Sequence, residues 1–494
     1  MSKQNYNSLI DYNSRTMALA EVAGLLSWDQ ETMMPRKGAA QRAEQSGAIQ
    51  TIIHERYTDT KVADWLAAID DKDLSAQQQR DVELIRRAHN RAVKIPVDLA
   101  TEIARLASEA QGIWAAARAA NQYSDFAPVL EKTIELRRQE AACLSNGSKC
   151  PYDALLDDYE AGMTTEVLTP LFDRLRGPLT DLRQEIADAG RAPAKVTGHF
   201  AKEAQLALGH KLAATFGYDG DAGRLDMSVH PFSSGSGADV RITTRIDETE
   251  PFGAIYSVIH ETGHAVYEQN IASDLRLKPT GAYCSMGIHE SQSRMFENQM
   301  GRSRAFMEWL YPEMRDAFGD IGVTSPEELY AAVNNVETGY IRTEADEVHY
   351  NLHVILRYNL ERDLINGDLD VKDLEGEWNR RFEADFGLAV PDAARGVLQD
   401  VHWSVGLFGY FPTYSLGNIY AADLYTGIQA DCPNLEQDVA AAQLAKPIGW
   451  LTDKVHKHGN TYAPATLIEN AVGQKPTEAA LIKYLRGKFL PLYS

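Results

Sequence analysis

The sequence predicts a mainly α-helical protein with a small amount of β structure. Two observations lead to this fold class. Residues 1 to about 185 are rich in Ala, Leu, Glu, Gln and Arg, with apolar residues three and four apart, as on one face of a helix. A helical pattern also covers most of the chain after 251, whereas the stretch 239–246 alternates in the manner of a half-buried strand.

In the N-terminal region, helical spacing is clearest in segments 73–93, 97–121 and 126–145. Prolines fall where we expect helices to begin or end, at Pro35, Pro96, Pro151 and Pro170. The sequence has no internal repeat and no low-complexity linker. We therefore expect a single domain over 1–494, with an N-terminal helical part at 1–225 and a second part at 226–494.

The stretch from 226 to 250 differs from its surroundings. Charged or polar residues alternate there with β-branched ones over 239–246, which predicts a strand. A helical pattern resumes at Pro251 and extends to about Asn270, with Thr249 just ahead of it as an expected cap. After a loop, further helices are expected from about 288 to the end.

Composition narrows the class of protein. The 494 residues are 44% hydrophobic, which is enough to bury a large core, and they carry a net charge of −21 from 70 acidic and 49 basic residues. Such a chain repels nucleic acid and anionic lipid surfaces, so neither is an expected partner. The four cysteines form no C-x-x-C pair, the first twenty residues lack an apolar signal core, and no stretch is long enough to span a membrane. We expect a cytoplasmic protein.

Residues 260–264, within the helix that follows Pro251, read His-Glu-Thr-Gly-His, an H-E-x-x-H motif. Histidines four residues apart lie on one face of a helix, so the imidazoles of His260 and His264 can bind one metal ion. Glu261 is then near enough to act on a water at the metal as general base. This composition would give only about 0.02 such matches by chance. The motif predicts a zinc-dependent peptidase, and Gly263 indicates that another backbone comes close.

A catalytic zinc ion usually takes three protein ligands, so one more is expected outside the motif. The downstream candidates are Glu268, Asp274, His289, Glu290 and Glu297. A glutamate from a second, packed helix would complete a site of two histidines and one glutamate. Spacing alone leaves Glu290 and Glu297 as rivals.

A second pair of histidines, His349 and His353, also lies four residues apart on an expected helix. The pair lacks the glutamate after its first histidine. We interpret it as packing and hydrogen bonding in the core, although His353 could still line the site.

Six short motifs occur in order along the chain. They are His230-Pro231-Phe232, Asp239-x-Arg241-x-Thr243, His260-Glu261-x-x-His264, His289-Glu290-Ser291-Gln292, Ile341-Arg342-x-x-Ala345-Asp346 and Gly396-x-x-Gln399-Asp400-x-His402-Trp403. Together with Trp28-Asp29-Gln30 and the tail at 481–493, they cover nearly the whole chain. The sequence resembles the thermostable carboxypeptidase 1 family of metallocarboxypeptidases.

The resemblance implies that Glu290 is the third metal ligand beside His260 and His264, which decides against Glu297. It implies a large helical body with a deep active-site groove and a small β-sheet beside the H-E-x-x-H helix. It further implies zinc as the metal, with Co²⁺ or Mn²⁺ able to substitute, and a homodimer. The expected reaction is removal of single amino acids from the free C-terminus of peptides, which places the catalytic part at 226–494.

One position departs from the wider class of zinc peptidases with a glutamate ligand. Many of them carry an aspartate four residues after that glutamate, where it supports a metal-binding histidine. Here the position is Arg294. The candidates for orienting the histidines are therefore Asp346 and Asp400.

The expected mechanism assigns proton transfer to Glu261 and stabilisation of the oxyanion to other side chains. Glu261 takes a proton from the attacking water and later passes it to the leaving amine. His230 and a tyrosine, either Tyr410 or Tyr414, are candidate donors to the oxyanion, and core packing is the alternative for the tyrosines.

An exopeptidase must also recognise a free carboxylate. The planar fork of a guanidinium matches that group. The resemblance makes Arg342 the best candidate. Arg241 could share the role, but its place on a strand also fits a structural ion pair.

Two other readings compete with this one. A related zinc oligoendopeptidase or dipeptidyl carboxypeptidase would share the helical fold and the motif, and a peptide with a blocked end would separate the activities. An aminopeptidase is disfavoured because no G-x-M-E-N segment precedes the motif. A helical binding or scaffold protein that keeps the motif without catalysis would bind no metal and cleave nothing.

Overall fold

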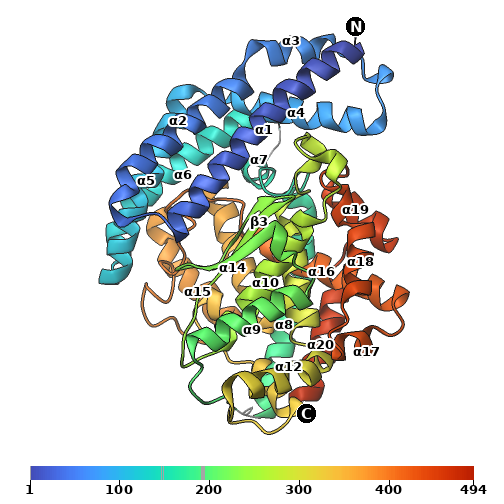
Figure 1. Ribbon diagram of the computed structural model, residues 1–494. Coiled ribbons are helices and arrows are strands. Elements are labelled where there is room, and N and C mark those ends of the chain that lie inside the picture. Colours follow the sequence, from blue (N-terminus) through green and yellow to red (C-terminus); the bar gives the residue numbers. More distant parts are fainter. Residues whose placement is uncertain (1, 146, 148–149, 191–194, 494) are drawn as a thin grey trace. The chain divides into compact units, whose positions relative to one another are not determined.

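The computed structural model describes residues 2–145, 147, 150–190 and 195–493. Within them the chain is mainly α-helical with a small three-stranded sheet, which confirms the predicted fold class (Figure 1). The chain forms two compact units, each from three segments. Unit 1 comprises residues 1–93, 193–333 and 420–476, and unit 2 comprises 94–192, 334–419 and 477–494. The single domain expected over 1–494 stays a prediction.

Unit 1 contains the sheet and most of the helices. Its helices are α1 Ser2–Thr32, α2 Ala39–Thr58, α3 Thr60–Ala68, α4 Ala76–Lys94, α9 Lys202–Thr215, α10 Phe252–Gln269, α11 Met286–Arg294, α12 Arg304–Phe318, α13 Pro326–Val333, α17 Leu435–Ala440, α18 Ala445–Lys454 and α19 Pro464–Val472. A π-helix, η6, follows α11 directly at Met295–Met300.

Unit 2 is helical. Its helices are α5 Val97–Ala120, α6 Tyr123–Leu144, α7 Pro151–Leu156, α8 Thr165–Ala189, α14 Glu347–Asn366, α15 Leu374–Phe386 and α20 Ala479–Tyr493. Helix α16, Pro412–Asp431, begins in unit 2 and ends in unit 1. Short 3₁₀ helices lie at Arg36–Gly38, Asp71–Asp73, Gly220–Ala222, Ser273–Leu275, Pro279–Gly281, Arg342–Glu344, Val371–Asp373 and His456–His458.

The sheet contains β1 Gly223–Met227, β2 Ser233–Ser236 and β3 Asp239–Thr244 in the order β1-β3-β2. The central strand β3 pairs in parallel with β1 and antiparallel with β2. It packs beside α10 (Figure 1). The Oγ1 of Thr244 on β3 lies 2.8 Å from the Oγ of Ser257 on α10. Alternation explains the strand, because Val240 and Ile242 are buried while Arg241 points to the other face. The expected strand and its position beside the motif helix are confirmed.

Two local predictions were wrong. The N-cap position of α10 is Pro251, and the carboxylate of Glu250 accepts hydrogen bonds from the first backbone N–H groups of the helix, those of Phe252 and Gly253. The hydroxyl of Thr249 instead donates to Asp247. Pro170 lies inside α8 rather than at its end. In both cases the predicted residue lies a few positions away from the helix end that the structure shows. The helices themselves occur where expected.

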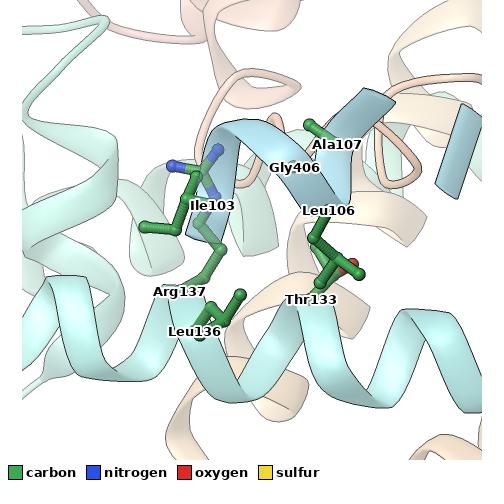
Figure 2. Close-up of a pocket in the computed structure, with 7 residues that line it drawn as sticks. All are labelled: Ile103, Leu106, Ala107, Thr133, Leu136, Arg137 and Gly406. Atoms are coloured by element: carbon green, nitrogen blue, oxygen red, sulfur yellow. The ribbon is translucent and has the colours of Figure 1, made fainter. Parts of the chain in front are cut away.

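Figure 2 shows a small pocket in unit 2 between α5 and α6. It is lined by Ile103, Leu106, Ala107, Thr133, Leu136, Arg137 and Gly406. The lining is largely apolar, and the guanidinium of Arg137 is held by Glu140 at 2.6 Å. None of the residues predicted for the functional site lines this pocket, so it is a packing feature of the helix pair.

Within the described ranges, no helix is both long enough and apolar enough to cross a membrane.

Candidate metal centre

Helix α10 carries the H-E-x-x-H motif and is held by its apolar side. Ile255, Val258, Ile259 and Val266 are all at most 3% exposed. This stripe fixes the rotation of α10, so that the motif residues face α11 instead of solvent.

Gly263 allows α10 and α11 to approach closely. A Cβ atom at this position would lie 2.5 Å from the Cα of Ser293 and 2.6 Å from the carbonyl oxygen of Gln292. Such distances are too short for any side chain. The predicted close approach of another backbone is therefore confirmed, and the backbone concerned is that of α11.

The close packing brings three ligand atoms together. The Nε2 atoms of His260 and His264 lie 3.6 and 3.5 Å from the same oxygen, Oε2 of Glu290. These distances are long for hydrogen bonds. Ligands about 2.1 Å from a tetrahedral zinc ion are roughly 3.4 Å apart, so the three atoms have the spacing of a shared ion. The chemistry and geometry of the three donors fit a divalent metal.

Glu290 is held in place by its other oxygen. The Nε of Arg294 donates to Oε1 at 2.7 Å, one helical turn further along α11. The hydroxyl of Ser293 donates to Oε2 at 3.2 Å. Burial raises the pKa of Glu290, but the charges of Arg294 and His260 outweigh it and leave the pKa well below the ordinary value. The carboxylate therefore stays ionised and presents one oxygen to the histidines.

His260 is oriented by a carboxylate on η6. Its Nδ1 lies 2.9 Å from Oε2 of Glu297. Glu297 in turn accepts hydrogen bonds from Arg294 at 3.4 Å and Arg302 at 3.1 Å. Glu297 thus contacts the ring nitrogen of His260 that faces away from Glu290, an arrangement that is usual behind a metal-binding histidine.

The Nδ1 atom of His264 faces a second imidazole. This atom lies 2.5 Å from Nδ1 of His289, and Nε2 of His289 lies 3.1 Å from a carboxylate oxygen of Glu268. His289 and Glu268 were candidate ligands in the sequence. In the structure His289 contacts the Nδ1 atom of His264, and Glu268 contacts His289. Both therefore lie on the Nδ1 side of His264, whereas its Nε2 atom faces Glu290.

The general-base candidate, Glu261, lies on α10 next to His260 and is 7% exposed. Within the described part of the chain, no hydrogen bond holds its carboxylate, which leaves the oxygens available to a proton. Burial raises the pKa of Glu261 to about 7, and the nearby carboxylates of Glu290 and Glu297 contribute to the rise.

The two histidines have different electrostatic surroundings. Burial lowers the pKa of His264 to about 3, and His289 adds to the effect. Burial also lowers the pKa of His260, but the charges of Glu290 and Glu297 outweigh it and leave the pKa raised. The difference follows from the partners, since a carboxylate faces one ring and an imidazole faces the other.

Arg342 lies in unit 2 and is buried. Its Nε and Nη2 reach Oδ1 of Asp400 at 3.0 and 2.9 Å, and its Nη1 donates to the hydroxyl of Tyr350 at 3.2 Å. Arg357 contacts the other oxygen of Asp400 at 2.5 Å. We call Arg342, Arg357 and Asp400 the arginine cluster. Burial raises the pKa of the Asp400 carboxyl group, but the charges of Arg357 and Arg342 outweigh this effect and hold the pKa well below its ordinary value.

Arg241 and His230 belong to unit 1. The guanidinium of Arg241 makes two hydrogen bonds to Asp239, at 2.8 and 3.0 Å, and lies 4.2 Å above the ring of Trp28. His230 is exposed in the loop between β1 and β2. Arg241 thus has the structural ion pair that its strand position suggested.

The tyrosine candidates lie in unit 2. The rings of Tyr410 and Tyr414 meet edge to face at 5.3 Å, and the hydroxyl of Tyr414 lies 3.3 Å from Nε2 of His402. Tyr410 also packs against Tyr159 at 5.1 Å. Both tyrosines are only partly buried.

The second histidine pair packs in the core of unit 2, as interpreted from the sequence. His349 is held by Asp346 at 2.8 Å and by Thr338 at 3.0 Å, and His353 is fully buried with its ring 4.5 Å from that of Phe386. Asp346 also caps α14. Asp346 and Asp400 therefore have other partners, and the expectation that they orient the metal histidines was wrong.

The contacts of Glu297 and His289 with the two histidines were not predicted from the sequence. The sequence did contain a signal for each, because His289 precedes Glu290 and Glu297 follows it by two helical turns. Two features could not be read from it. The π-helix sets the direction of Glu297, and the packing of α11 on α10 sets that of His289.

Comparisons with known proteins agree with this geometry. Residues 8–489 match the family model described as carboxypeptidase Taq (M32) metallopeptidase. Thermostable carboxypeptidase 1 of Thermus thermophilus is 39% identical over 503 residues, covering 99% of both chains. The crystal structure of the M32 carboxypeptidase from Deinococcus radiodurans R1 superposes with a TM-score of 0.96 at 39% identity, covering 99% of both chains. Metallocarboxypeptidase 1 of Trypanosoma cruzi superposes with a TM-score of 0.96 at 33% identity and the same coverage. The chain therefore belongs to the carboxypeptidase Taq (M32) metallopeptidase family and is a metallocarboxypeptidase, a hydrolase that depends on a divalent metal and acts on peptides.

Proposed function

We propose that this chain is a zinc carboxypeptidase that removes one amino acid at a time from the free C-terminus of peptides. The observation that carries the proposal is the convergence of His260, His264 and Glu290 beside Glu261. Two neutral imidazoles and one carboxylate are a donor set that zinc prefers, and Co²⁺ or Mn²⁺ would substitute.

Glu261 is the proposed general base. A zinc ion held by the three ligands would polarise the scissile carbonyl and make water acidic enough to react. The Glu261 carboxylate accepts the proton of the attacking water and then donates it to the nitrogen of the departing amino acid. Its position on α10, fixed by the buried stripe, keeps it beside the ligands without making it one of them.

Donors to the oxyanion are proposed among His230, Tyr410 and Tyr414. Each side chain carries an N–H or O–H that can donate to a developing negative charge. His230 lies in the same unit as the metal ligands and is exposed, so its ring is accessible to a substrate. The hydroxyl of Tyr414 has a partner in His402, which would hold it in position as a donor.

For the free carboxylate of the substrate we propose Arg342. Its guanidinium is held by Asp400 and surrounded by the rings of Tyr350, Phe411 and Tyr414, with centroids 5.9, 5.4 and 5.0 Å away. A buried guanidinium with a fixed orientation binds an anion at little entropic cost. Arg241 is assigned a lesser part in substrate binding, since Asp239 and Trp28 already engage it.

The Arg342→Ala variant is expected to lower kcat/KM for free-ended peptides by roughly 10²-fold, the value of a lost charge-assisted hydrogen-bond pair. Metal content should not change. Asp400 keeps Arg357 as a partner, so the fold should survive. The exposed Arg395, paired with Asp392, supplies the matched control Arg395→Ala. An equal loss of metal and activity would show that Arg342 is structural.

The proposed reaction is tested with one short peptide in two forms, with a free and with an amidated C-terminus. We expect amino acids to be released one at a time from the free form only, with loss of activity after chelation and recovery with Zn²⁺ or Co²⁺. Cleavage of the amidated peptide at an internal bond would establish the oligoendopeptidase alternative. Release of dipeptides would establish a dipeptidyl carboxypeptidase.

We also propose that the enzyme acts as a homodimer in the cytoplasm. The dimer is supported by the family resemblance, and the compartment by the small number of cysteines in a long chain. Light scattering on the purified protein measures the first directly.

A further inference from the structure

His260 and His264 on α10 differ in the residue that contacts their Nδ1 atom. Each presents Nε2 toward Glu290, which leaves Nδ1 to a partner. For His260 the partner is the carboxylate of Glu297, whereas for His264 it is the ring of His289. An imidazole is an uncommon choice, since metal-binding histidines usually donate to a carboxylate, a backbone carbonyl or water.

The contacts of His289 define where its proton lies. A histidine that binds a metal through Nε2 carries its proton on Nδ1, so His264 must donate to Nδ1 of His289. That nitrogen then has to be an acceptor, and the proton of a neutral His289 must lie on Nε2. Nε2 is the atom that faces Glu268, at 3.1 Å. The carboxylate of Glu268 accepts that proton and so selects the required tautomer.

Packing holds His289 in this orientation. Its ring meets those of Tyr267 and Tyr283 edge to face, with centroids 5.3 and 5.0 Å away. Glu268 is 6% exposed and lies one turn after His264 on α10. His289 precedes Glu290 on α11. The contacts therefore join the two ligand-bearing helices a second time, on the far side of the ligands.

We propose that His289 is the positioning residue for His264, and that Glu268 positions His289. We call these three residues the orienting relay. The inference rests on the proposed metal site and deepens it. A neutral acceptor polarises His264 less than Glu297 polarises His260, so the metal receives one strongly and one weakly donating imidazole.

The test compares two substitutions at the same position. His289→Leu removes the acceptor and keeps a side chain of similar bulk, whereas Asn places an amide oxygen near the former Nδ1. We expect His289→Leu to weaken Zn²⁺ binding, measured against a competing chelator, by about 10- to 100-fold. His289→Asn should recover most of that loss. The visible absorption spectrum of the Co²⁺-loaded protein should change in His289→Leu and return toward the wild type in His289→Asn.

A variant at the other end of the relay keeps the proposal testable if His289→Leu fails to fold. Glu268→Met removes the carboxylate, after which His289 adopts the required tautomer only part of the time. We expect a weaker Zn²⁺ affinity than in the wild type, with a smaller loss than in His289→Leu. At saturating Zn²⁺ both variants should approach wild-type activity, because neither residue is proposed to touch the substrate.

The outcomes separate this inference from the proposed function. If the wild-type protein binds no Zn²⁺, the proposed function fails. If it binds Zn²⁺ and the folded variants His289→Leu and Glu268→Met bind it equally tightly with an unchanged Co²⁺ spectrum, the orienting relay is wrong and the proposed function stands.

Discussion

The Glu261→Gln variant is expected to lose about 10²- to 10⁴-fold in kcat and to retain its metal. The glutamine side chain has nearly the same shape but cannot take a proton, so only the proton transfer is removed. The proposed ligands His260, His264 and Glu290 are untouched, and no hydrogen bond to the Glu261 carboxylate is lost within the described residues. The fold should therefore be unchanged.

The measurement pairs steady-state kinetics on a free-ended peptide with metal analysis of the same preparation. A KM close to that of the wild type would place the defect in the chemical step. A variant that keeps more than about a tenth of wild-type kcat would show that another group removes the proton. A variant that loses its metal would show that Glu261 helps to hold the ion.

The Glu290→Gln variant is expected to lose metal affinity by more than about 10²-fold. Substitution of a residue that only hydrogen-bonds a metal ligand typically lowers the affinity by about 10- to 100-fold, so the expected loss exceeds that range. Removal of the charge takes away the carboxylate whose Oε2 lies 3.6 and 3.5 Å from the Nε2 atoms of the two histidines. The matched control is Glu297→Gln, because the Glu297 side chain is only 13% exposed, against 8% for Glu290, and also bonds Arg294. For Glu297→Gln a loss within the 10- to 100-fold range is expected.

Competition with a chelator measures both affinities under one condition. The order of the two losses decides which glutamate binds the metal, a choice that sequence spacing left open. If Glu297→Gln loses more affinity than Glu290→Gln, the ligand assignment must be exchanged. Thermal unfolding of the metal-free proteins checks that neither substitution acts by destabilising the fold.

Periodicity predicted the elements that carry the centre. The buried stripe of α10 and the alternation of β3 are patterns within one element, so local sequence contains them. The convergence of His260 and His264 follows from the helix repeat in the same way. The fold class and the family resemblance were also correct.

The partners of the ligands depend on contacts between elements, and these were not predicted. Asp346 and Asp400 were chosen from motifs, but Asp346 caps α14 and Asp400 pairs with two arginines. The positions of Glu297 and His289, which contact the two histidines, depend on the π-helix and on the contact of α11 with α10, and neither feature leaves a periodic pattern. The wrong cap at Thr249 has a similar cause, because Glu250 one residue later competes for the same backbone N–H groups.

The contact at Gly263 has a consequence for protein engineering. A designer who copied the ligands onto another pair of helices would reproduce the chemical groups but not the spacing that makes them converge. That spacing is set by a residue that binds nothing and has no side chain. In a transplanted centre, position 263 would have to be treated as part of the functional motif, and screens that vary only polar residues would overlook it.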